Sequence, residues 1–342
     1  MATIAAESAE KNWNGVSAKL GYSTSISVLL PNYNHSLYLP RALDALASQT
    51  TAPDEIVIVD DGSTDDSLSV IRSFKKKLPQ MRVLHNPVNL GVNHSVNLAI
   101  ANAAGAYVAC SAADDWLEPQ FIEKMRSSLR TFPQARLIVS AYVEFFEQEG
   151  TTVVHSRQSE RGCWYAPDEP TFISPAKLHD LLKRSFVWLP ISGALIHKDT
   201  LLSIGGLDPA LRWHADWFAN SAIALRHGFA VIPEPLSVFR VAPNTYSTIG
   251  IKNPKNQREI CAAVYAKLKS PLFADTYNAM RQRPATLTPF IRYFVQNLAP
   301  SPRDWPFLVA ILSWWLNEAR RGRRPRQLRD LLKARGLLAP PN

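Results

Sequence analysis

The sequence is poor in cysteine and has no long apolar segment. Cys110, Cys163 and Cys261 are too few and too scattered for a disulfide framework or a zinc knuckle. We therefore expect a reducing compartment, the cytoplasm. The longest apolar run, Trp305 to Leu316, has twelve residues, whereas a membrane-spanning helix needs about 20. No secretory signal is expected either, because the N-terminal residues lack an apolar core.

Several catalytic patterns are also missing. We find no phosphate-binding Walker loop, no Ser-His-Asp arrangement and no zinc-ligand spacing. The composition, with 46% hydrophobic and 20% charged residues, excludes a disordered chain. The length of 342 residues predicts one large domain with an appendage.

Positive charge is concentrated near the C-terminus. The formal net charge is +9. Between residues 303 and 335 nine basic residues face only Asp304, Glu318 and Asp330. The basic residues are Arg303, Arg320, Arg321, Arg323, Arg324, Arg326, Arg329, Lys333 and Arg335. Basicity is therefore a property of this segment, and the remainder of the chain is close to balanced.

Hydrophobic spacing predicts an α/β fold. Residues 26–30 and 55–59 are β-rich apolar runs, and between them leucines recur with helical spacing. Further strands are expected at 81–84, 106–110 and 136–146, with helices between them. This alternation predicts a parallel sheet with right-handed crossovers. Ligands bind such sheets at the carboxyl ends of the strands.

The remaining segments complete the predicted domain organisation. We expect a leader over residues 1–24, a catalytic domain over 25–245 and a helical, basic extension over 246–342. Within the second half, a helix is predicted from Ala215 to His227 and a last strand from Leu236 to Val241. Ser63 with Asp66 resembles a capping box at the start of a helix.

Two acidic pairs follow predicted strands. Asp60-Asp61 and Asp114-Asp115 stand at the carboxyl ends of two strands and are expected to converge. Four close carboxylates would raise one another's pKa values unless a divalent cation bound between them. One of them could instead accept hydrogen bonds from a base or a ribose. The structural alternative is that these aspartates cap the following helices.

A third candidate is the segment from Trp213 to Trp217. Asp216 lies between two indole rings, and a partly desolvated carboxylate is a usable general base. The alternative is an N-cap aspartate flanked by core aromatics. His214 could be a ligand, a base, or a surface or core residue without such a role. The loop Asn89–Asn93 could cradle a nucleotide or be a plain loop.

These residues together resemble the family 2 glycosyltransferases, which have the GT-A fold. The resemblance covers roughly residues 25 to 245. It rests on Pro31–Asn34, Gln49-Thr50, Ile58–Asp65, Asn89–Gly91, Ala104-Gly105 and Asp114-Asp115 with Pro119. It implies a Rossmann-like, mostly parallel central sheet flanked by helices, with a C-terminal helical extension.

The resemblance also implies roles for single residues. Pro31 and Tyr33 would border the nucleobase, Asp61 would hydrogen-bond it with Asp60 in support, and Asn93 would lie close to the nucleotide. Asp114 and Asp115 would hold the ribose and a divalent metal, Mn²⁺ or Mg²⁺, on the donor diphosphate. Asp216 would be the catalytic base. The pocket for the transferred sugar and the acceptor would comprise Ser192, Gly193, Trp213, His214 and Trp217.

Three positions depart from the family pattern. Ala112 replaces the first aspartate of the usual D-x-D, Ala215 replaces the glutamate before the base, and Ala242 replaces a histidine after Arg240. Each change removes a contact to metal, donor or acceptor. A non-catalytic, nucleotide-binding relative is therefore one alternative. A nucleotidyltransferase is another, but Pro31–Asn34 is not the Gly-rich basic loop that it would carry.

The segment 305–335 combines an apolar, aromatic stretch with arginines. This composition suits an interfacial helix on an anionic membrane, or a helix packed on the catalytic domain with a solvated basic face. Nucleic-acid binding is not expected, because basic and aromatic residues are segregated. The expected partners are thus a nucleotide sugar, with UDP as the expected nucleotide, and a saccharide, lipid-linked or protein acceptor. If residues 305–335 bind lipid, the protein would lie at the inner face of the membrane.

Overall fold

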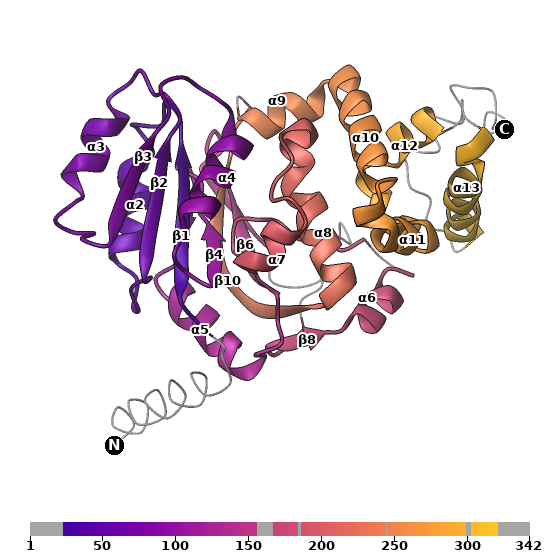
Figure 1. The fold of residues 1–342 in the computed structure, drawn as a ribbon, viewed down its shortest axis with the longest axis horizontal. Coiled ribbons are helices and arrows are strands. Elements are labelled where there is room, and N and C mark those ends of the chain that lie inside the picture. Colours follow the sequence, from indigo (N-terminus) through magenta and orange to yellow (C-terminus); the bar gives the residue numbers. More distant parts are fainter. Residues whose placement is uncertain (1–22, 156–166, 184–185, 244, 299–301, 321–342) are drawn as a thin grey trace.

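The computed structural model describes residues 23–155, 167–183, 186–243, 245–298 and 302–320. Most of the predicted leader, Cys163 and the arginines from 321 onward lie outside these residues. In Figure 1 a central sheet is flanked by helices, and helices α10 to α13, orange to yellow, stand together on one side of it. From residue 246 on, every regular element that the structure describes is a helix.

The first half of the domain is a regular strand–helix alternation. Strands β1, β2, β3 and β4 are paired in parallel in the order β3-β2-β1-β4. The elements are β1 (Ile26–Asn32), α2 (Leu39–Ala47), β2 (Glu55–Asp60), α3 (Ser67–Ser73), β3 (Met81–His85), α4 (Val92–Asn102) and β4 (Tyr107–Cys110). The predicted alternation is present.

The second half adds mixed pairing. Its elements are β5 (Trp116–Leu117), α5 (Phe121–Thr131), β6 (Leu137–Phe146), β7 (Thr151–His155), β8 (Thr171–Ile173), α6 (Pro175–Leu181), β9 (Ala194–His197), α7 (Lys198–Ser203), η1 (Pro209–His214), α8 (Ala215–His227) and β10 (Phe229–Val241). The main path of the sheet is β3-β2-β1-β4-β9-β6-β10-β5, with β7 paired to β6 and β8 paired to β10. Strand β9 runs antiparallel to β4 and β6, whereas β6 and β10 are parallel. The sheet is thus parallel on one side and mixed on the other.

A turn at Gly193 explains why β9 is antiparallel. Ser192 forms an isolated bridge with Cys110 at the end of β4, so the chain enters β9 from the carboxyl end of its neighbour. Gly193 has φ of +75°, which favours glycine. A Cβ there would lie 2.3 Å from Ser237 Oγ. No crossover helix is needed for this connection.

Alternate residues of the buried strands face two hydrophobic clusters. Leu29 of β1 and Val57 of β2 pack in one cluster with α4, α8 and the C-terminal helices. Val28 and Ile56 pack in the other with α2 and α5. This follows from the two-residue period of a strand. Both faces of the sheet are therefore covered.

The C-terminal helices are α9 (Tyr246–Lys252), α10 (Pro254–Leu268), α11 (Ala274–Gln282), α12 (Ile291–Leu298) and α13 (Trp305–Arg320). Helices α10 to α13 share the first of these clusters. Phe273 packs on Phe218, and Phe290 packs on Trp217, both of helix α8. The extension thus has a continuous core with the sheet. No helix among the described residues is long and apolar enough to cross a bilayer.

Candidate active site

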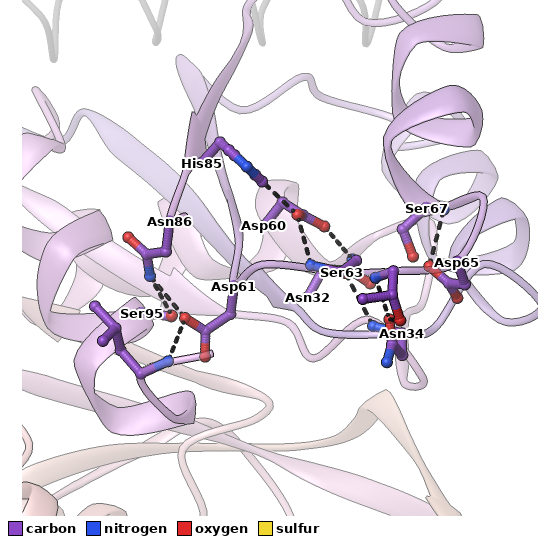
Figure 2. A network of polar contacts seen from close by, with 12 residues as sticks. Asn32, Asn34, Asp60, Asp61, Ser63, Asp65, Ser67, His85, Asn86 and Ser95 are labelled. Atoms are coloured by element: carbon purple, nitrogen blue, oxygen red, sulfur yellow. Dashed lines mark hydrogen bonds and ion pairs between the residues drawn. The ribbon is translucent and has the colours of Figure 1, made fainter. Parts of the chain in front are cut away.

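Asp60 ties three neighbouring strand ends together. Asn32, Asp60 and His85 are in register across β1, β2 and β3. The buried Asp60 carboxylate accepts hydrogen bonds from Asn32 Nδ2 (2.9 Å) and from the backbone N–H of Ser63 (3.1 Å), and lies 3.1 Å from His85 Nδ1 (Figure 2). Asp60 therefore joins the ends of β1, β2 and β3, and its support of Asp61 at a nucleobase stays a prediction.

Asp61 shapes the loop before α4. Its carboxylate accepts from Asn86 Nδ2 (2.7 Å) and from the backbone N–H groups of Leu90 (3.0 Å) and Gly91 (2.8 Å). Burial alone would raise the pKa of Asp61, but these hydrogen bonds lower it below its usual value. Figure 2 shows Asp61 turned toward Asn86 and Ser95. A contact from Asp61 to a nucleobase stays a prediction.

The loops after β1 and β2 are joined side by side. Asn34, with φ of +53°, donates its N–H to Ser63 Oγ (2.9 Å) and accepts from Thr64 N–H (2.7 Å). The predicted capping box is wrong, because α3 begins only at Ser67 and Ser63 serves this loop instead. Tyr33 is 41% exposed beside the joined loops. Its ring is therefore accessible to a ligand, whereas Pro31 is buried.

The second acidic pair is held by the last strand. Asp115 Oδ1 accepts from the backbone N–H of Arg240 (2.9 Å), and Asp115 Oδ2 accepts from Ser192 Oγ (3.4 Å). The Arg240 guanidinium, in turn, pairs with Asp114 (3.2 Å) and Glu147 (2.6 Å) and lies over the ring of Tyr38. Within the part of the chain that the structure describes, no contact joins this pair to Asp60 or Asp61. Strand β1 lies between β2 and β4.

The side chains of Asp114 and Asp115 fit a hard divalent cation. Such cations take oxygen ligands, and Mg²⁺ commonly binds one or two carboxylates together with waters and substrate phosphates. Burial, and then the charge of Asp114, raise the pKa of Asp115, whereas its hydrogen bonds with Arg240 N–H and Ser192 lower it. Residues 23–320, where described, contain no group of three or more His, Cys, Asp or Glu that could hold a metal. A role of Asp114 and Asp115 as metal ligands stays a prediction.

Asp216 lies in the first turn of α8, near the second pair. The N-cap of this helix is His214, so the interpretation of Asp216 as the cap is wrong. Burial raises the pKa of Asp216 to about 6. Hydrogen bonds from the backbone N–H groups of Trp217 and Ile191 lower the pKa and so oppose part of this effect. Burial, and then the charges of Asp216 and Asp115, raise the pKa of Cys110 to about 12. The negative charges of Asp216 and Asp115 therefore both influence the pKa of the Cys110 thiol at the end of β4.

The aromatic neighbours of Asp216 belong mainly to the core. Trp217 is fully buried, and His214 is buried with its Nε2 2.6 Å from Gln257 Oε1. Burial lowers the pKa of His214 to about 4, so it is neutral at physiological pH. Trp213 donates to the same Gln257 oxygen (3.2 Å). The prediction that His214 and Trp217 line a pocket is therefore corrected: packing against Phe290 of the C-terminal helices buries them.

Asn93 also has an internal role. Its Nδ2 donates to the carbonyl oxygen of Arg212 (2.8 Å), which fastens α4 to η1. Arg212 is exposed and has φ of +47°, a conformation that non-glycine residues rarely adopt. Such strain often accompanies functional sites. Sequence analysis assigned no role to Arg212, Tyr38 or Glu147; none has a local sequence signal.

Comparison with known proteins agrees with this architecture. Residues 27–179 match the model of the family described as glycosyl transferase family 2. The chain is 34% identical over 131 residues to glycosyltransferase GlyA of Streptococcus pneumoniae, covering 38% of this chain and 18% of that relative. It is 36% identical over 162 residues to chondroitin synthase of Pasteurella multocida, covering 42% and 17%. The chain thus spans about a fifth of the length of these two relatives.

A solved structure shows the same fold. S. aureus TarS 1–349 in complex with UDP-GlcNAc superposes with a TM-score of 0.62 at 15% sequence identity, covering 93% of each chain. At 15% identity this likeness shows the fold alone. Together with the family match, it confirms the resemblance that the motifs indicated. Residues 27–179 thus match glycosyl transferase family 2, and the chain has the GT-A fold.

Proposed function

We propose that the protein is an inverting glycosyltransferase that moves a sugar from a nucleoside diphosphate sugar to an acceptor hydroxyl. The nucleotide that we propose for the donor is UDP. One observation carries this proposal: the adjacent residues Ile191 and Ser192 hydrogen-bond to Asp216 and Asp115, so the buried Asp216 carboxylate, with its raised pKa, lies close to a proposed metal ligand. A base and a diphosphate-binding group at one sheet edge are what such a transfer requires.

Asp216 is the proposed general base. Its carboxylate takes the proton of the acceptor hydroxyl as the acceptor oxygen attacks the anomeric carbon. The bond from that carbon to the diphosphate breaks, and its electron pair leaves with the diphosphate. Attack from the face opposite the leaving group inverts the configuration. A pKa near 6 leaves Asp216 ionised at neutral pH yet more basic than an ordinary aspartate.

The donor would bind across the ends of β1, β2 and β4. Tyr33 offers an exposed ring for the nucleobase, and the loop that Asp61 holds borders the same edge. Asp114 and Asp115 would hold a divalent cation, which neutralises charge on the departing diphosphate. Ser192 and the backbone N–H of Arg240 orient Asp115 for this role. The three alanines at 112, 215 and 242 leave the cation with few protein ligands.

The acceptor is proposed to be a saccharide, free, lipid-linked or attached to a protein. The similarity to chondroitin synthase over 162 residues supports polysaccharide or glycoconjugate synthesis. A cytoplasmic location is part of this proposal, and the buried free thiols of Cys110 and Cys261 are compatible with it.

Release of nucleoside diphosphate tests the proposal. The full chain would be incubated with UDP-, GDP-, dTDP- and CDP-sugars, with Mn²⁺ and a pool of saccharide acceptors. We expect release from one nucleotide class and no release by Asp216→Asn. Nucleotide binding without release from any donor would contradict catalysis and favour a non-catalytic nucleotide-binding module.

A further inference from the structure

Helix α13 has one face in the protein core. Phe307, Ile311 and Trp315 recur at four-residue spacing and are buried in the cluster that includes α11 and α12. This face fixes the helix on the C-terminal extension, at the edge of the molecule in Figure 1. The orientation of α13 is therefore determined by packing, and the opposite face is turned outward.

The outward face is uncharged from Trp305 to Asn317 and mainly apolar, with Ser313 and Asn317 as exposed polar residues. Val309 is 58% exposed and Leu316 is 51% exposed, with Leu312 partly buried between them. Spacings of three and four residues place the three on one side of the helix. No charged residue occurs from Trp305 to Asn317. A surface helix ordinarily carries charged residues on its outer face, and contiguous exposed apolar surface marks an interaction site.

The surrounding charge selects the partner. Arg303 is exposed just before α13, and Arg320 is the last residue of the helix. The sequence continues with Arg321, Arg323 and Arg324, so that basic residues outnumber Asp304 and Glu318 around the helix. A second copy of this chain would bring the same positive charges to the contact. An anionic lipid surface offers both an apolar layer and opposite charge. The apolar part of α13 is too short to span a bilayer.

We propose that α13 lies in the interface of an anionic membrane, with Val309, Leu312 and Leu316 among the lipid chains and Arg303 at the headgroups. The basic sequence that follows the helix would add to the electrostatic attraction. Apolar burial and headgroup charge both contribute to such binding. This inference stands on the surface of α13 and is independent of the proposed catalytic function. It would hold the enzyme at the membrane face where lipid-linked acceptors are available.

Cosedimentation with vesicles tests the proposal. We expect the full chain to bind vesicles of equal parts phosphatidylglycerol and phosphatidylcholine, and pure phosphatidylcholine only weakly. The double variant Val309→Glu/Leu316→Glu should lower the partition coefficient about tenfold or more. Arg323→Glu with Arg324→Glu should lower it about fivefold per arginine, on the anionic vesicles alone. Higher salt should weaken binding.

Matched controls keep the test decisive. Leu202→Glu/Val154→Glu changes two comparably exposed apolar residues away from α13 and should bind like the wild type. Thermal unfolding verifies that each variant is folded. Absence of vesicle binding by the wild type, or equal binding by the α13 variant, would overturn the proposal. So would a wild-type dimer, seen by light scattering, that the α13 variant converts to a monomer.

Discussion

Replacement of Asp216 by asparagine should lower kcat by about 10²–10⁴-fold, the usual contribution of a general base. Asparagine keeps the shape and can still accept the hydrogen bond from Trp217 N–H, which is 2.7 Å long in the wild type. Nucleotide affinity should therefore change little. Asp199→Asn is a matched control, since Asp199 is also an acidic residue in the first turn of a helix, α7.

The pH dependence of the same variant provides a second readout. In the wild type, kcat/KM should rise with pH through about 6 and then level off, because burial raises the pKa of Asp216 to about 6 and the base must be ionised. This rise should be absent from the residual activity of Asp216→Asn. A profile that is unchanged in the variant would exclude Asp216 as the base.

Asp216→Asn should also stabilise the fold at neutral pH. A carboxyl group whose pKa is raised by folding destabilises the folded state at pH values above that raised pKa, because the ionised form is disfavoured there. This destabilisation disappears as the pH falls from about 6 to about 4. The corresponding gain for the variant is at most about 3 kcal/mol in the free energy of unfolding at pH 7.5, and close to zero at pH 4. Denaturant unfolding at both values checks this. Loss of activity together with a gain in stability is the expected result when a catalytic residue is removed.

Replacement of Asp61 by alanine should lower the free energy of unfolding by about 2–4 kcal/mol at neutral pH. The buried carboxylate is the acceptor for the Asn86 side chain and for two backbone N–H groups of the loop that ends at Gly91. Removing it leaves the buried Asn86 amide short of an acceptor. Nucleotide affinity should fall together with stability, because the loop before α4 loses its anchor.

The pH dependence of the free energy of unfolding tests whether the ionised Asp61 carboxylate anchors the loop. The lowered pKa of Asp61 means that its contribution is present above the unfolded value of about 3.9 and is lost as pH falls through the folded value. The difference between wild type and variant should therefore shrink below about pH 4. Asp66→Ala is the control, since Asp66 makes no side-chain cap hydrogen bond. If Asp61→Ala lost nucleotide affinity at unchanged stability, Asp61 would act on the ligand and not on the loop.

Local patterns predicted most of the fold. The helix Ala215–His227 was predicted with the bounds that the structure shows, because an apolar periodicity and a following Gly228 define it. The last strand was predicted only from Leu236, since Pro233 and Pro235 suggest a break. The structure runs β10 from Phe229 through both prolines, with register shifts there that accommodate them.

The site was predictable in part for a physical reason. Asp60 ends β2 and Asp115 follows β4, so the parallel topology places both at the carboxyl ends of strands, whereas Asp216 lies in the first turn of α8. Long-range partners have no such signal. Asn93 bonds to the Arg212 carbonyl 119 residues away, and His214 to Gln257. These bonds assign Asn93 and His214 to the framework, which spacing along the chain could not reveal.

Calorimetric titration of UDP, GDP, dTDP and CDP, each with and without Mn²⁺, tests the central claim most directly. For the wild type, the account predicts that one nucleotide binds and that Mn²⁺ tightens this binding. In Asp115→Ala the metal-dependent gain should be lost, a decrease of at least about a hundredfold, since even residues behind a metal ligand contribute about 10–100-fold. Failure of every nucleotide to bind, or equal binding with and without Mn²⁺ in both proteins, would contradict a metal-assisted donor site at Asp114 and Asp115.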